Sequence, residues 1–151
     1  GFDLVSLTAI DRDALTEHCR SLEAMQTSIG SCSLGELYAV PRFGQADFTT
    51  DHVVAARIDR GPLIATAQVH RVSRLLAWGE LWYTAWPGDW AHGPSAQCIG
   101  RALHWARRHG LASLVVYSKT DGESERRMLT RAGFVVSSRQ GELVGELELS
   151  D

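Results

Sequence analysis

The chain has 151 residues, the ordinary length of one domain, so we expect a single domain over residues 1–151. Hydrophobic residues make up 44% and charged residues 22%, a composition typical of a folded soluble protein that needs no metal or disulfide for its stability. The formal net charge of −3 argues against a partner such as nucleic acid or an anionic membrane, because both favour a basic surface.

Apolar periodicity and turn residues divide the first half of the chain mainly into strands. The sequence Asp-Arg-Gly-Pro at 59–62 predicts a turn between two β-prone runs, so these runs are expected to pair as an antiparallel hairpin. In chain order we expect a strand at 2–8, a helix at 11–28, a less regular segment with a short helix at 29–44, strands at 51–58 and 63–72, and a long strand at 75–86.

The second half predicts a crossover between two parallel strands. A loop at 87–96 precedes a helix at 97–109, which Gly110 ends, and the apolar run at 111–118 indicates a buried strand. A strand, a helix and a further strand in this order make 75–86 and 111–118 parallel neighbours. The chain closes with a helix at 121–133 and strands at 134–138 and 142–150.

Cysteines and histidines show no metal-binding pattern. The chain has 3 cysteines without a CxxC pair and 6 histidines without HExxH spacing, so we expect no disulfide framework, no metal and a reducing, cytoplasmic location. No stretch approaches the roughly 20 apolar residues of a transmembrane helix, so no membrane partner is expected.

The strand at 75–86 carries a candidate acid–base residue. Alternation of side chains places Glu80 on one face between two tryptophans. A carboxylate among aromatic rings loses hydration, and this raises a carboxyl pKa toward the range useful to a general base. A surface glutamate at a strand end is the alternative, but the tryptophans clustered at 78–90 favour a lined cleft. The face comprises Leu76, Trp78, Glu80, Trp82, Thr84 and Trp86.

The helix predicted at 97–109 begins with the residues Gln-Cys-Ile-Gly-Arg-Ala. A helix N-terminus offers unpaired N–H groups and a positive dipole end, which suit a phosphate group, and small residues let phosphate oxygens approach the backbone. One glycine in a short run is a weak pattern, and a close-packed helix start is the alternative. The inner face of this helix carries Ile99, Ala102, Leu103 and Ala106, and the outer face carries Arg101, His104, Arg107 and Arg108.

From Gly79 onward the sequence resembles the GCN5-related N-acetyltransferases (GNAT). That family has a phosphate loop of pattern Q/R-x-x-G-x-G/A, which residues 97–102 match after a strand and a proline. Residues 110–134 resemble the family's fifth strand, fourth helix and terminal Gly-Phe, and residues 141–149 resemble its closing strand. The first half is similar, by element order only, to bacterial protein-lysine acetyltransferases.

The resemblance implies a fold and its ligands. The fold class is α/β (α+β): a mixed, mostly antiparallel sheet of about six or seven strands flanked by about four helices, with strands four and five parallel and splayed. Acetyl-CoA is implied as the acyl donor and co-substrate, without a metal. The implied acceptor is a primary amine, either a small molecule or a protein lysine. The sequence leaves a homodimer open.

The resemblance also implies catalytic roles. Glu80 occupies the place of the family's general base early in strand four, where it would take a proton from the acceptor's ammonium group. Leu129 stands where the family has its general-acid tyrosine, and Tyr117 is the nearest substitute. An aromatic residue that closes the sheet is an equal alternative for Tyr117. A degenerate domain of the same fold, binding acyl-CoA or a protein partner without turnover, is the alternative function.

For the cofactor, the resemblance implies backbone contacts. The pantetheine arm would pair with the backbone of Tyr83, Thr84 and Ala85. If Leu103 marks the family's usual helix leucine, Gly100 becomes the last glycine of the phosphate loop, and Cys98 would then crowd the phosphate; this register stays open. In the first register, the pyrophosphate would lie on the amides of Gln97, Cys98, Ile99, Gly100, Arg101 and Ala102.

Overall fold

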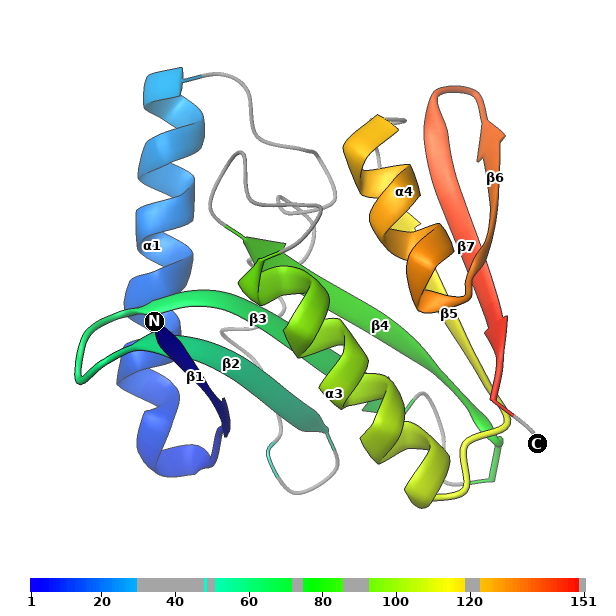
Figure 1. Cartoon of the computed structure of the whole chain (residues 1–151), viewed down its shortest axis with the longest axis horizontal. Helices are drawn as coiled ribbons and strands as arrows, with labels where there is room; N and C mark the ends of the chain where they lie inside the picture. Colours follow the sequence, from blue (N-terminus) through cyan, green and yellow to red (C-terminus); the bar gives the residue numbers. More distant parts are fainter. Residues whose placement is uncertain (30–47, 49–50, 72–74, 86–92, 119–122, 150–151) are drawn as a thin grey trace.

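A seven-stranded sheet runs through the computed structural model, which describes residues 1–29, 48, 51–71, 75–85, 93–118 and 123–149. The strand order is β1-β2-β3-β4-β5-β7-β6 (Figure 1). All neighbouring strands are antiparallel except β4 and β5, which are parallel, as the crossover predicted. The strands are β1 (Phe2–Ser6), β2 (His52–Ile58), β3 (Leu63–Arg71), β4 (Trp78–Ala85), β5 (Ser113–Ser118), β6 (Val135–Arg139) and β7 (Glu142–Glu148).

The helices cover both faces of this sheet. A 3₁₀ turn, η1 (Ala9–Asp11), leads into α1 (Arg12–Ile29), which packs on one face, hereafter the α1 face. The other face, hereafter the α3 face, carries α3 (Pro94–Arg108) and α4 (Glu123–Ala132) (Figure 1). The predicted mixed sheet between helices is therefore confirmed.

The core on the α3 face is almost entirely apolar. Helix α3 contributes the predicted stripe of Ile99, Ala102, Leu103 and Ala106, all of them buried. Burial of one large aliphatic side chain contributes roughly 1.5–3 kcal/mol, so this stripe anchors the helix firmly. The strands and α4 supply the residues it packs against, among them Val54, Ala56, Ala65, Ala67, Val69, Leu81, Leu114, Val116, Met128 and Leu129.

The core on the α1 face is smaller and covers only the first strands. Leu15 and Cys19 lie one helical turn apart on α1, and both are buried against β2 and β3. The rest of this core consists of Leu7, Val53, Ala55 and Leu63. Along the later part of β3 the same face carries polar side chains, and along β4 it carries Glu80 and Thr84 beside tryptophans.

Two predicted starts differ from the structure by three residues, and other boundaries differ by one or two. Helix α3 begins at Pro94, three residues before the predicted start at 97, because proline has no N–H to satisfy and suits the first position of a helix. Strand β4 begins at Trp78 rather than at 75, and residues 75–77 are exposed. The short helix predicted within 29–44 and the loop at 87–92 lie outside the described residues.

No helix in the described part of the chain is both long and apolar enough to cross a membrane.

Candidate active site

Strands β4 and β5 pair over a short distance and then separate. Their ladder joins Trp78 to Ser113, Gly79 to Leu114 and Glu80 to Val115. Beyond these pairs the described part of β4 continues to Ala85 beside β3 alone, and β5 continues beside β7 (Figure 1). We call the point of separation, after Glu80 and Val115, the fork. The backbone of β4 beyond the fork therefore offers an edge to which an extended ligand can hydrogen-bond.

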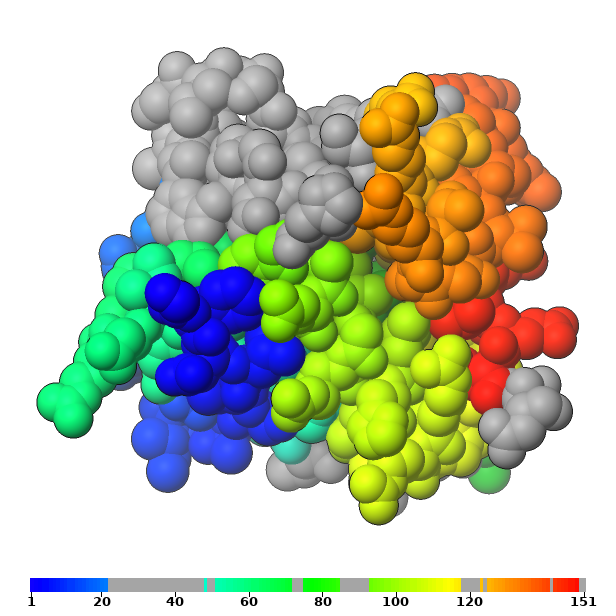
Figure 2. All heavy atoms as spheres, viewed as in Figure 1, coloured from blue at the N-terminus to red at the C-terminus, as the bar shows by residue number. Residues whose placement is uncertain are grey.

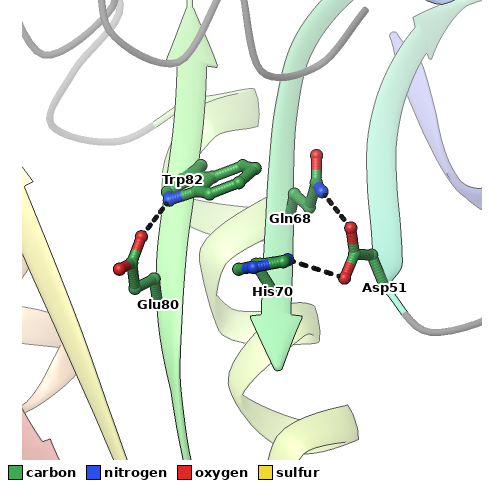
Figure 3. A network of polar contacts seen from close by, with 5 residues as sticks. All are labelled: Asp51, Gln68, His70, Glu80 and Trp82. Atoms are coloured by element: carbon green, nitrogen blue, oxygen red, sulfur yellow. Dashed lines mark hydrogen bonds and ion pairs between the residues drawn. The ribbon is translucent and has the colours of Figure 1, made fainter. Parts of the chain in front are cut away.

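Glu80 lies at the fork and projects from the α1 face. Its side chain is partly buried, and its Oε2 accepts a hydrogen bond of 2.8 Å from the indole Nε1 of Trp82 (Figure 3). Trp82 shares this face with Glu80, as the alternation predicted, and the hydrogen bond between them was not predicted. Trp86 and Trp90, which belong to the predicted aromatic lining, lie outside the described residues.

A second acid–base group lies on β3 directly opposite Glu80. His70 is the register partner of Glu80, and its ring stacks on Trp82 with 4.8 Å between ring centroids and 18° between the planes. Its Nδ1 lies 2.9 Å from Oδ1 of Asp51, and Oδ2 of Asp51 accepts a 2.9 Å hydrogen bond from Nε2 of Gln68. Figure 3 shows these side chains in a row across the strands.

A glycine permits the close approach of β3 and β4 at this place. A Cβ atom at Gly79 would lie 2.7 Å from the carbonyl oxygen of His70, closer than any real Cβ contact. The residue before Glu80 therefore has to be glycine for these backbones to keep their spacing. This spacing in turn holds His70 beside Glu80.

The polar row on the α1 face continues with a buried histidine. Nδ1 of His18, on α1, donates to the carbonyl of Leu63 at 3.0 Å, and Nε2 lies 2.7 Å from Oγ1 of Thr84. With the proton of the ring on Nδ1, Nε2 accepts a hydrogen bond from the Thr84 hydroxyl. The Thr84 oxygen in turn accepts a hydrogen bond from the Thr66 hydroxyl. Burial lowers the pKa of His18 from 6.5 to about 4, so the ring is neutral at pH 7.

The α3 face near the fork carries a buried tyrosine. The Tyr83 hydroxyl donates to Oε1 of Glu125 at the start of α4, and both side chains are buried. Tyr117 of β5 lies on the opposite side: Val115, two residues earlier, is the register partner of Glu80, so Tyr117 shares the Glu80 face. Its side chain is 59% exposed.

The start of α3 exposes fewer amides than predicted. Gly93 precedes the helix in an extended conformation without a side-chain cap, and the amide of Gln97 already bonds to the Gly93 carbonyl at 3.4 Å. From Gln97 onward the amides pair inside the helix, which leaves those of Ser95 and Ala96 as the unpaired ones of the first turn. The Ser95 hydroxyl is fully buried and has no hydrogen-bond partner among the described residues.

The residues of the predicted phosphate loop divide between the two sides of α3. Cys98 points at the sheet, with Sγ 3.8 Å from the Ala65 carbonyl, and burial raises its thiol pKa to about 12, so its side chain cannot crowd a phosphate group. Ile99 and Ala102 are also buried, whereas Gln97, Gly100 and Arg101 are exposed.

A groove of about 320 Å³ follows the exposed flank of α3 toward α4. In Figure 2 the atoms of these two helices, yellow-green and orange, adjoin on the visible face. Two arginines are among the residues that line this largely apolar groove. Its lining comprises Ala96, Ile99, Gly100, Leu103, Arg107, Met128, Arg131 and Ala132.

Solved structures share this architecture, although no protein-family model and no curated protein matches the sequence. The GNAT domain of S. lividans PAT is 18% identical with a TM-score of 0.67, over 97% of this chain and 90% of that chain. The GNAT-family acetyltransferase of Staphylococcus aureus Mu50 is 7% identical with a TM-score of 0.73, over 99% and 100%. The yncA protein of Salmonella typhimurium, solved with its cofactor acetyl-CoA, is 15% identical with a TM-score of 0.71, over 100% and 95%.

The chain has the GNAT fold. The resemblance stated from the residues of the second half is confirmed for the whole described fold, including its parallel pair β4–β5.

Sequence reasoning missed the most connected polar groups of the molecule. Asp51 lies just before β2, Gln68 and His70 lie in the second half of β3, and no motif marks them. The available signal was alternation: Thr66, Gln68 and His70 form a polar row on a strand whose other face is apolar. No group of three or more His, Cys, Asp or Glu side chains in the described ranges is arranged to hold a metal ion.

Proposed function

We propose that this chain is an N-acetyltransferase that moves an acetyl group from acetyl-CoA to a primary amine on a small molecule or a protein lysine. The observation that carries the proposal is the position of Glu80, which projects beside the fork between two parallel strands of a GNAT fold. The presence of acetyl-CoA in yncA, a protein of the same fold, supports the choice of donor.

The described residues fit such a cofactor. Beyond the fork no described strand pairs with β4 on the side of β5, and this edge suits an amide-bearing arm, so we assign the pantetheine to the backbone of Tyr83, Thr84 and Ala85. The N-terminal end of α3, whose first N–H groups have no partner within the helix, suits a pyrophosphate. Of the predicted loop, the exposed residues Gln97, Gly100 and Arg101 flank that end, while Cys98, Ile99 and Ala102 seat the helix on the sheet.

Glu80 prepares the acceptor for attack. An amine with a pKa of about 10 is almost wholly protonated at pH 7, so it must lose a proton before its lone pair can react. In our proposal the Glu80 carboxylate, oriented by the indole N–H of Trp82, takes that proton. The bound thioester supplies the activated acetyl group.

The amine nitrogen then forms a bond to the acetyl carbon, and the carbon–sulfur bond breaks. A β4 amide facing the fork would stabilise the negative charge that develops on the carbonyl oxygen. We assign protonation of the departing sulfur to Tyr117, because the Tyr83 hydroxyl is engaged with Glu125. The Tyr117→Phe variant should then slow turnover while it leaves acetyl-CoA binding unchanged.

A Glu80→Gln variant tests the proposal. Release of the CoA thiol with a panel of primary amines, and calorimetry with acetyl-CoA, separate chemistry from binding. We expect turnover to fall by about 100-fold or more, because that is the usual contribution of a general base, while the affinity for acetyl-CoA stays within about twofold. Glu148→Gln, an exposed change at the C-terminal end of β7, two strands away from Glu80, is the matched control. Unchanged turnover in Glu80→Gln would remove Glu80 as the base.

A binding domain without turnover is the second candidate. Leu129, fully buried, stands where the resemblance places a general-acid tyrosine. Saturable acetyl-CoA binding with no acetylation of any amine in the panel would favour this candidate. Absence of both binding and turnover would contradict both candidates.

A further inference from the structure

The strongest unassigned feature is the Asp51–His70 pair on the α1 face. The Asp51 side chain is only 4% exposed, while that of His70 is 36% exposed. A buried carboxylate is costly unless each oxygen is hydrogen-bonded, and both are: Oδ1 by His70 and Oδ2 by Gln68. The carboxylate is therefore held in one orientation behind the histidine.

This contact fixes which nitrogen of His70 carries the proton. An ionised carboxylate only accepts hydrogen bonds, so Nδ1 of His70 must donate to Asp51. In the neutral ring, Nε2 then has a lone pair and can act as a base. A carboxylate behind an imidazole also stabilises the imidazolium that forms when Nε2 takes up a proton.

The pair lies on the same face of the sheet as Glu80. His70 and Glu80 are direct partners in the β3–β4 ladder, and the Cβ atoms of such opposing residues lie about 4.5–5.5 Å apart. Trp82 stacks on the His70 ring and donates to the Glu80 carboxylate, so one indole positions both groups. In Figure 3, His70 lies between Asp51 and the Glu80–Trp82 pair.

We propose that His70, held by Asp51, receives the proton that Glu80 takes from the acceptor, and so returns Glu80 to its basic form for the next turnover. This inference rests on the proposed acetyl transfer. The transfer runs through a bridging water and is balanced: the O–H bond of the Glu80 carboxylic acid breaks as the water takes that proton, an O–H bond of the water breaks as the Nε2–H bond forms, and the imidazolium then loses its proton to solvent. Glu80 is nearest the fork and touches the substrate, whereas His70 acts through Glu80.

If His70 only held its neighbours in place, free imidazole could not replace it. Rescue of a His70 variant by imidazole therefore tests the relay. In His70→Ala we expect kcat to fall by about 100-fold, the low end of acid–base contributions, with the KM for acetyl-CoA unchanged. Free imidazole should restore kcat in proportion to its concentration. Asp51→Asn, which keeps the size of the side chain, should lower kcat without becoming sensitive to imidazole.

His52→Ala is the matched control. His52 lies on the opposite face, stacked on Trp105 of α3 with 4.6 Å between centroids, and does not face Glu80. We expect this variant to keep its kcat. A His70→Ala enzyme with unchanged kcat, or with a lowered kcat that imidazole does not restore, would overturn the relay.

Nitrogen NMR of the imidazole gives a readout independent of turnover. We expect the neutral His70 ring to carry its proton on Nδ1, and Asp51→Asn to change that tautomer. A ring protonated on Nε2, in a protein that still binds and turns over acetyl-CoA, would overturn the relay and leave the acetyltransferase proposal intact. Loss of acetyl-CoA binding and turnover in the unaltered protein would overturn the proposed function and the relay with it.

Discussion

The two faces of the sheet are built from the same strands but hold different chemistry. On β3, Val69 faces α3 in an apolar core, while the next residue, His70, faces the other way into a polar row. Helix α3 covers its face with a continuous aliphatic stripe, whereas the described apolar core under α1 is smaller and takes only Trp82 from β4. The difference indicates that stability comes mainly from the α3 face, which leaves the α1 face free to carry charged and polar groups.

The largest stability effect should come from the α3 face. Ile99→Ala removes a fully buried side chain from the stripe, and we expect the free energy of unfolding to fall by about 2–5 kcal/mol. Urea denaturation measures this loss. Arg108→Ala, an exposed change on the same helix, is the control and should stay within about 0.5 kcal/mol. Equal losses in the two variants would contradict the assignment of the core.

On the α1 face, the buried side chain of His18 should lower the free energy of unfolding at acid pH. The folded state takes up a proton on His18 only near pH 4, whereas the unfolded chain takes it up as the pH falls through 6.5. The unfolded state therefore binds more protons in this window, so stability decreases as the pH falls from 6.5 to about 4 and is unaffected by His18 above it. The full effect is about 3 kcal/mol.

Denaturation curves between pH 7 and 4 check this effect. His18→Gln should have a flatter stability profile than the unaltered chain over that range. His104→Gln, an exposed change on α3, should keep the original slope. A slope unaltered by His18→Gln would show that the acid sensitivity has another source.

A smaller change at the β3–β4 contact should affect both faces. Gly79→Ala places a methyl group 2.7 Å from the His70 carbonyl, so the two strands must shift apart. We expect about 1–3 kcal/mol of destabilisation from this overpacking, together with a change in the His70 NMR signals. Thermal denaturation and NMR spectra measure the two effects. Unchanged stability and unchanged His70 signals would mean that the strands tolerate a wider spacing.

The smallest effect on stability should come from an ion pair on the outer surface of α4. Arg127 and Glu123 form a 3.1 Å ion pair one helical turn apart, and their side chains are 66% and 76% exposed. Exposed pairs of this kind contribute about 0.3–0.5 kcal/mol, so Arg127→Ala should change the urea midpoint very little, and less in high salt. A loss above 1 kcal/mol would place this pair in a larger network.

Local pattern predicted the parts of the molecule that depend on one element. The apolar spacing of α3 identified its buried stripe, and alternation along β4 placed Glu80 on a shared face with Trp82. The crossover rule predicted the parallel pairing of β4 and β5. Each of these features follows from residues close together in the sequence.

Features that need several segments could not be predicted in the same way. Asp51 and His70 are 19 residues apart, and their contact depends on the β2–β3 register, which no motif encodes. The start of α3 was misplaced because Pro94 and Ser95 are typical of loops as well as of first helical turns. The pairing of β2 with β3 decides the first case, and the proline at the first helical position decides the second.

The short β4–β5 ladder divides the sheet into two leaves, one of β1–β4 and one of β5–β7. Within the first leaf each strand pairs with its neighbour in sequence, and in the second β6 and β7 form a hairpin, so both leaves need mostly local contacts. In the described part of the chain they are connected by the three residue pairs of this ladder, by hydrogen bonds from the amides of Ala112 and Ser113 to the Ala77 carbonyl, and by the packing of α3 and α4. Because loop closure must precede non-local pairing, we expect this seam to form late in folding and to open first. A ligand that contacts both β4 and β5 at the fork would then hold the two parts of the sheet together and oppose this opening.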